Sequence, residues 1–103
     1  MSMAVSSAPA APERNWAVDV YPNPFGHAPE IWYELSTSTA LSFSLTDVTG
    51  KVLYAEKTGR QSAGRYRFEV PDVIFEQLPA GLYFLRGENG VTAGTFKLVK
   101  IAK

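Results

Sequence analysis

Apolar and polar residues alternate with a period of two through most of this chain. The pattern occurs in about seven short runs, residues 16–20, 31–35, 41–46, 52–54, 65–70, 82–84 and 96–98. Successive side chains of a strand point to opposite faces of a sheet, so each run predicts a strand with one buried and one solvated face. The apolar positions, Val52, Tyr54, Leu82 and Phe84 included, are expected in the core, and the Ser, Thr, Arg, Lys and Glu positions are expected to face solvent.

Residues typical of turns separate these runs. Asp47 and Gly50 occupy the first and fourth positions that a type I turn favours, which predicts a hairpin between the flanking runs. Residues 88–90, Glu-Asn-Gly, predict a second hairpin, because Asn-Gly readily adopts positive φ. Residues 79–81, Pro-Ala-Gly, mark a third turn. The segment 71–78 stays open between a single helical turn and a short strand.

About seven short alternating strands with turns between them predict an all-β fold, a small antiparallel β-sandwich of the immunoglobulin-like kind. The 103 residues suit a single domain. Residues 16–103 are expected to form it. Residues 1–15 are rich in Ser, Ala and Pro and are expected to be an extended linker, which suggests a piece of something longer.

Composition narrows the classes of partner and cofactor. Ten basic residues balance ten acidic ones, so no net field draws the chain to nucleic acid or to an anionic membrane surface. No run approaches the ~20 apolar residues of a membrane-spanning helix. Cysteine is absent and histidine occurs once, so thiolate and paired-histidine metal sites cannot form within one chain. No metal or other cofactor is expected.

A catalytic set is hard to assemble from these residues. His27 supplies the single imidazole, and its place in a proline-rich loop favours an exposed loop residue over a general base. No serine lies in the G-x-S-x-G turn of a nucleophile elbow. The carboxylates of Glu30, Glu34, Glu56 and Glu69 lie in or beside polar positions of the alternation, where a solvated face explains them. The chain is not expected to be an enzyme.

Two features suit binding instead. Trp32 falls on the polar side of its run, where it would form a stacking platform for a sugar or a peptide unless neighbours cover it. Basic residues gather toward the carboxyl end, among them Lys97 and Lys100. They fit either a solvated edge strand, on which lysines discourage unwanted pairing, or a charged strip that a partner grasps.

Four segments, taken in order, carry a family pattern. They are V-Y-P-N-P-F at residues 20–25, L-T-D-V-T-G-K-V-L at residues 45–53, L-P-A-G-L-Y-F-L at residues 78–85 and T-F-K-L-V-K at residues 95–100. Together they resemble the type A C-terminal sorting domain of proteins exported by the type IX (Por) secretion system of Gram-negative bacteria. Residues 101–103 extend past the usual end of that family, and the stretch 70–77 is longer than its usual counterpart.

The resemblance implies a secretion signal at the carboxyl end of a larger cargo protein. The cargo would cross the inner membrane by a separate amino-terminal signal, meet the type IX translocon and its shuttle components from the periplasm, and then cross the outer membrane. A sortase-like peptidase would remove the domain by cleavage in or near residues 1–15, and the cargo would be released or attached to surface lipopolysaccharide. The implied location is the cell surface or the medium.

The resemblance also implies roles for the motif residues. Thr95, Lys97, Val99 and Lys100 are expected to engage the translocon, with the two lysines exposed beside a free strand edge that can add to a receptor sheet. Replacing both lysines by alanine should then leave thermal melting nearly unchanged. The other motif residues are expected to shape the fold: Pro22, Asn23 and Pro24 the loop, Asp47 the turn, Gly50 and Gly81 the backbone, and Tyr83 the core or its rim.

Two other classes of function fit the same fold. A carbohydrate-binding or fibronectin-like accessory module of a secreted enzyme would show coplanar exposed aromatic residues around Trp32. A structural spacer or adhesin piece would tolerate deletion of the last residues without an effect on export. An exposed last strand also predicts that two copies of the chain can pair as an edge-strand dimer.

Overall fold

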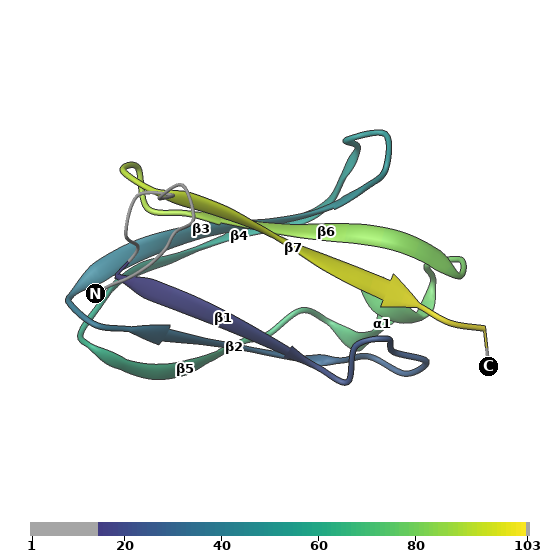
Figure 1. The fold of residues 1–103 in the computed structure, drawn as a ribbon, viewed down its shortest axis with the longest axis horizontal. Coiled ribbons are helices and arrows are strands. Elements are labelled where there is room, and N and C mark those ends of the chain that lie inside the picture. Colours follow the sequence, from purple (N-terminus) through teal and green to yellow (C-terminus); the bar gives the residue numbers. More distant parts are fainter. Residues whose placement is uncertain (1–14, 103) are drawn as a thin grey trace, which may run out of the picture.

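The computed structural model describes residues 15–102. Figure 1 shows its elements: β1 (Trp16–Tyr21), β2 (Glu30–Leu35), β3 (Thr39–Asp47), β4 (Val52–Gln61), β5 (Gly64–Phe68), α1 (Asp72–Glu76), β6 (Gly81–Glu88) and β7 (Ala93–Lys100). The seven strands confirm the expected all-β chain, and the segment 71–78 contains a short helix. Of the expected linker, residues 1–14 lie outside the described residues.

The strands form two antiparallel sheets that pack face to face as the two layers of a sandwich (Figure 1). The order is β1-β2-β5 in one sheet and β4-β3-β6-β7 in the other. The chain passes between the sheets after β2, after β4 and, through α1, after β5. This distribution of consecutive strands over two sheets confirms the predicted immunoglobulin-like sandwich.

Alternating residues of the facing strands fill the core, as the period of two predicts. The buried apolar residues are Trp16, Phe25, Ile31, Tyr33, Leu35, Leu41, Phe43, Leu45, Phe68, Val70, Phe75, Tyr83, Leu85 and Leu98. Burying one Leu, Ile or Phe side chain contributes about 1.5–3 kcal/mol relative to leaving it in water. This core therefore fixes which face of each strand points inward.

In β6 the predicted faces are reversed. Tyr83 and Leu85 are buried, whereas Leu82 and Phe84 are half-buried on the outer face of the four-stranded sheet. Residues 82–85 are apolar at every position, so a period of two cannot say which pair faces the core. Pairing with β3 decides it, because Leu85 lies opposite the buried Leu45.

The prediction that Val52 and Tyr54 share the core face is wrong for Val52. Thr46 pairs with Val52 and Leu45 pairs with Tyr54, so Leu53 is an extra residue on β4 at this point. Such a β-bulge turns the side chains on its two sides to opposite faces. Val52 is consequently exposed, while Tyr54 packs against the core.

Three segments far apart in the sequence meet at one end of the sandwich: the loop after β1, α1, and the end of β7 (Figure 1). The rings of Phe25 and Phe75 are fully buried there and pack edge to face, with centroids 5.5 Å apart. Phe25 also forms an isolated bridge with Lys100. Two of the family motifs are therefore in direct contact in the folded chain.

Hydrogen bonds connect Asn15, one residue before β1, to the sandwich. The amide of Ser36 donates to the carbonyl of Asn15 at 2.8 Å, and the side-chain amide of Asn89 donates to the Asn15 side-chain oxygen at 3.2 Å. Asn15 is thus bonded to the loop after β2 and to the loop before β7. Asn15, expected to be the last residue of the linker, thus contacts the sandwich.

Candidate recognition surface at the terminal strand

The side chains of β7 divide between the solvent and the core. Thr95 and Lys97 are exposed, Val99 is half-buried, and Leu98 and Lys100 are buried. The exposed pair lies on the outer face of the four-stranded sheet. Of the residues expected to engage a translocon, Thr95 and Lys97 are therefore the two whose side chains are freely accessible.

The expectation that Lys100 is exposed is wrong. Its side chain is 8% exposed, and its ammonium group donates to the carbonyl oxygens of Phe75 at 2.7 Å and Glu76 at 3.3 Å. Carbonyls in the last turn of a helix have no partner within the helix, and a lysine can satisfy them. Lys100 thus ties the end of β7 to α1.

The loop after β1 covers one half of the free edge of β7. The side chain of Asn23 donates to the carbonyl of Lys97 at 2.8 Å and accepts from the amide of Val99 at 3.0 Å. The backbone of Phe25 continues the pattern, accepting from the Ile101 amide at 2.9 Å and donating to the Val99 carbonyl at 2.8 Å. Asn23 and Phe25 together, here called the clamp, replace a neighbouring strand.

The clamp gives Asn23 a definite structural role. Pro22 and Pro24 flank it and have no amide hydrogen, so they donate no backbone bond to β7. The side-chain amide supplies both a donor and an acceptor at this point. The expectation that residues 22–24 shape the loop agrees with this geometry, although the sequence did not indicate that the Asn23 side chain bonds β7.

Asn23→Asp should destabilise the domain by about 1–2 kcal/mol at neutral pH, because the carboxylate cannot donate to the Lys97 carbonyl and faces its oxygen. A protonated acid can donate, so folding should raise the pKa of this carboxyl. The deficit relative to the parent should therefore be complete above that raised pKa and shrink as the pH falls below it. Denaturant titrations over this range test the prediction.

Asn23→Ala is the matched control, because it removes both side-chain bonds at every pH. Its deficit relative to the parent should not change with pH. Equal pH dependence of the Asp and Ala variants would contradict the clamp geometry.

Among residues 15–102, no segment gives such cover to the other half of the β7 edge. Along an antiparallel ladder, residues alternate between those whose backbone groups face the partner strand and those whose groups face away. Lys97, Val99 and Ile101 direct backbone groups at the clamp. The register with β6 runs without a shift from Ala93 to Lys100, so Ala93 and Thr95 also face away from β6.

Tyr83 is a core residue rather than a rim residue. It is 6% exposed, and its hydroxyl donates to the carbonyl of Pro79 at 2.6 Å. Burial raises the pKa of this phenol. A tyrosine near the start of the sixth strand that bonds backbone a few residues upstream is a feature of immunoglobulin-like sandwiches. It holds the turn before β6, where Gly81 adopts a φ of +153° that favours glycine.

The hairpin between β3 and β4 is built on Asp47. One oxygen of its carboxylate accepts from the Thr49 amide at 2.8 Å, the Thr49 hydroxyl at 2.6 Å and the Lys51 amide at 3.1 Å. The amide of Gly50 closes the turn on the Asp47 carbonyl at 3.0 Å, with a φ of +90° at Gly50. The hydrogen bond from the Thr49 hydroxyl, followed by those from the backbone, lowers the pKa of the carboxyl.

This lowered pKa predicts a contribution to acid stability. The native state favours the ionised carboxylate, so the contribution is complete above the unfolded-state value near 3.8 and is lost as the pH falls through the lower folded-state value. Asp47→Asn keeps an acceptor but has no charge to lose. Between about pH 5 and about pH 2, its stability should fall less steeply than that of the parent in denaturant titrations. Parallel curves would contradict this role.

Trp32 does not present a free aromatic face. The Arg65 guanidinium lies over its ring, 5.1 Å from the centroid, and its indole nitrogen donates to Glu30 at 2.9 Å. Trp32 is in none of the aromatic pairs found among residues 15–102. The coplanar aromatic residues that a carbohydrate-binding module would need are thus not formed around it.

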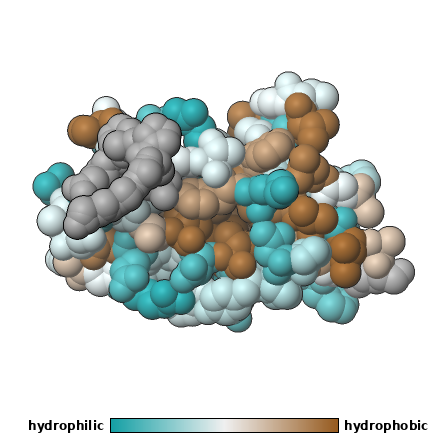
Figure 2. Space-filling model, in the orientation of Figure 1, coloured by the Kyte–Doolittle hydropathy of each residue, from teal (hydrophilic) through white to brown (hydrophobic). Residues whose placement is uncertain are grey.

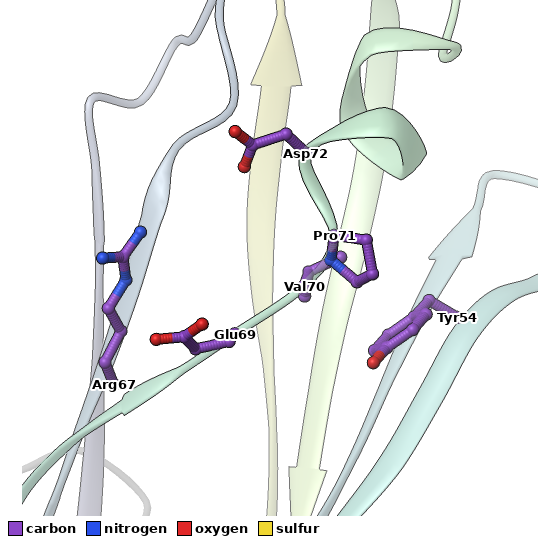
Figure 3. Close-up of a pocket in the computed structure, with 6 residues that line it drawn as sticks. All are labelled: Tyr54, Arg67, Glu69, Val70, Pro71 and Asp72. Carbon is purple, nitrogen blue, oxygen red and sulfur yellow. The ribbon is translucent and has the colours of Figure 1, made fainter.

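A cavity of about 350 Å³ lies beside β4 and β5, at the strand edges opposite β7 and β1. Figure 3 shows Arg67, Glu69 and Asp72 on one side of it and the ring of Tyr54 on the other. None of its lining residues belongs to the four motifs. Within the described residues no cluster of three or more His, Cys, Asp or Glu side chains could hold a metal, and no helix is long and apolar enough to cross a membrane.

The fold is similar to part of PorZ, described as an essential bacterial surface component of the type IX secretion system of Porphyromonas gingivalis. The TM-score is 0.53 at 20% identity, over 82% of this chain and 11% of that one. The chain thus spans about a tenth of the length of PorZ, and the likeness concerns the fold. No curated protein matches the chain.

A family model also matches most of the chain. The family model described as the secretion system C-terminal sorting domain matches residues 19–101. This range contains all four motifs, the clamp and the whole of β7. The chain therefore belongs to the family of type IX secretion system C-terminal sorting domains.

Proposed function

We propose that this chain is the secretion signal at the carboxyl end of a larger exported protein, and that the type IX outer-membrane translocon recognises it through β7. The family match over residues 19–101 carries the proposal. Sorting domains of this family are typically non-catalytic, so the role of the chain is to be bound. The exposure of Thr95 and Lys97 on the last strand supports β7 as the surface that the translocon recognises.

The four residues expected to engage the translocon divide between two tasks. Thr95 and Lys97 contact the receptor directly. Val99 and Lys100 keep the strand in place, the first through its backbone bonds to the clamp and the second through its bonds to α1. Loss of Lys100 should therefore impair export only as far as it impairs folding.

The proposed route leads through the periplasm and across the outer membrane to the cell surface or beyond. Shuttle components deliver the cargo to the translocon. A sortase-like peptidase then cuts the linker formed by residues 1–15, and this cut separates the cargo from the domain of residues 16–103. Cleavage upstream of Asn15 would leave the hydrogen bonds of this residue to the loops after β2 and before β7 in place.

An export assay tests the proposal. A fluorescent reporter carrying an amino-terminal signal peptide is followed by residues 1–103, and it is expressed in a host with a working type IX system and in a translocon-null twin. The reporter should appear outside the cells of the competent host alone, and deletion of residues 95–103 should abolish this. Equal export from both hosts, or unchanged export after the deletion, would refute the proposal.

Lys97→Ala should lower the exported fraction, because Lys97 lies on the surface proposed to contact the translocon. It should not lower the melting temperature, because the side chain is exposed. Lys57→Ala is the matched control, because Lys57 is an exposed lysine on β4, the other edge of the same sheet.

The mass of the exported parent reporter shows whether the chain is cleaved. Full-length product at the surface would exclude the peptidase step while leaving recognition intact.

A further inference from the structure

We propose that residues 93–97 of β7, here called the open edge, accept an extended strand of a partner protein that carries acidic side chains on one face and apolar side chains on the other. The proposal rests on the proposed function and specifies how the receptor engages the terminal strand. It follows from three observations: which backbone groups the clamp leaves uncovered, which charges lie beside them, and what lies between β7 and β1.

The uncovered backbone groups are confined to a short stretch. Asn23 and Phe25 occupy the outward groups from the Lys97 carbonyl to the Ile101 amide. Within residues 15–102 no backbone hydrogen bond connects the outward groups of Ala93 and Thr95 to another segment. An added strand would find both groups of each of these residues, and the Lys97 amide, in ladder geometry.

The opposite edge of the same sheet differs in the way expected of a protected edge. The pairing of β4 with β3 shifts register twice, and Glu56, Lys57 and Arg60 of β4 are exposed. Bulges and charged side chains are how sheets discourage added strands. Around the open edge the register is continuous, and residues 93–95 read Ala-Gly-Thr. The free edge of β7 is thus the one suited to pairing.

The charges beside the open edge select an acidic partner. Thr95 lies between Lys97 on its own strand and Arg86 directly opposite on β6, and both cations are exposed. Among residues 15–102 no carboxylate lies within ion-pairing distance of Lys97, and Arg86 has a single loose pair with Glu88 at 3.9 Å. Carboxylates on the same face of an added strand would pair with these cations across the ladder.

The other face of an added strand would meet apolar side chains. Val18 and Val20 of β1, the edge strand of the other sheet, are half-buried and pack against the core. Figure 2, in the orientation of Figure 1, shows hydrophobic surface in the band between β7 and β1. Because strand side chains alternate between faces, a strand on β7 would place every second residue over this band.

A proline variant separates backbone pairing from side-chain contact. The amide of Thr95 faces away from β6, so Thr95→Pro removes a donor from the open edge without removing a bond to β6, and edge strands accept proline at such positions. In the export assay with residues 1–103, Thr95→Pro should lower the exported fraction at least about five-fold, and Thr95→Ala should lower it little. Equal effects of the two variants would overturn strand addition.

Folding and charge are controlled separately. Each purified variant is melted, and if Thr95→Pro melts below the parent, Ala93→Pro tests the same edge from the first residue of β7. Lys97→Glu should weaken export about two- to five-fold, and Lys57→Glu should not. Equal losses from these two charge reversals would overturn the acidic partner.

The outcomes distinguish this proposal from the proposed function. If the parent is not exported in a translocon-dependent manner, the proposed function fails and this proposal fails with it. If the parent is exported and a folded proline variant is exported equally well, only the open edge is refuted. Sedimentation of the parent provides the last test: a dimer that Thr95→Pro converts to a monomer would mean that a second copy occupies the edge, which would overturn the choice of partner.

Discussion

Phe25→Ala is expected to lower the stability of the domain by about 3–5 kcal/mol. The Phe25 ring is fully buried and packs edge to face on Phe75, so its removal leaves a cavity between the loop after β1 and α1. A loss of this size should lower the melting temperature of a domain of this length by about 12 °C or more. Thermal melting followed by circular dichroism measures it.

Phe25→Leu is the matched variant, because it keeps most of the buried volume and the backbone bonds to Val99 and Ile101. It should cost about 1–2 kcal/mol, well below the alanine change. Val48→Ala controls for a change at a side chain that is 65% exposed and should leave melting nearly unchanged. If Phe25→Ala and Val48→Ala had the same melting temperature, the packing of the Phe25 ring would not stabilise the sandwich.

Lys100→Ala is expected to destabilise the domain by about 2–3 kcal/mol. This is a large effect for a lysine, because lysine side chains are almost never fully buried. The change leaves the Phe75 and Glu76 carbonyls without their donor and opens a gap beside α1. Lys97→Ala, on the same strand, should change stability by less than about 0.5 kcal/mol. Denaturant midpoints of the two variants test the contrast.

Lys100→Met separates the lost hydrogen bonds from the lost packing. Methionine keeps an unbranched apolar stem but cannot donate, so it should recover only part of the loss. Similar midpoints for the alanine variants at positions 97 and 100 would place the Lys100 side chain in solvent. That result would restore the expectation that both lysines can be replaced without a stability cost.

The strands were predictable because their signal is local. Alternation in residues 31–35 and 41–46 placed their apolar side chains in the core correctly. It failed for the run at 82–85, which is apolar on both faces, and at the bulge after Val52, because pairing with β3 settles both. The residues of one strand do not by themselves show the register in which it pairs with its neighbour.

For Lys100, position in the strand predicts burial, whereas residue type predicts exposure. Phe96, Leu98 and Lys100 share the even positions of β7, and a strict period of two places all three side chains toward the core. That signal was available in the sequence. The acceptors that make burial tolerable belong to α1, whose formation from residues 71–78 the sequence left open.

The clamp could not be predicted from its own residues. A loop with prolines at positions 22 and 24 reads as irregular structure, and the contacts of Asn23 lie 74 and 76 residues away in the sequence. Only the meeting of the loop with β7 gives the side chain its role. The motifs of a sorting domain are thus fold determinants as well as candidate signals. Asn23 and Phe25 contribute to the candidate signal by holding β7 in place.

If the clamp closes one half of the β7 edge and leaves the other half open for recognition, the outward amides of the two halves should differ in protection. Amide hydrogen exchange, read residue by residue by NMR, tests it most directly. We expect slow exchange at Val99 and Ile101, whose amides bond Asn23 and Phe25, and fast exchange at Thr95 and Lys97. Equal protection along the whole strand, or fast exchange at Val99 and Ile101, would contradict it.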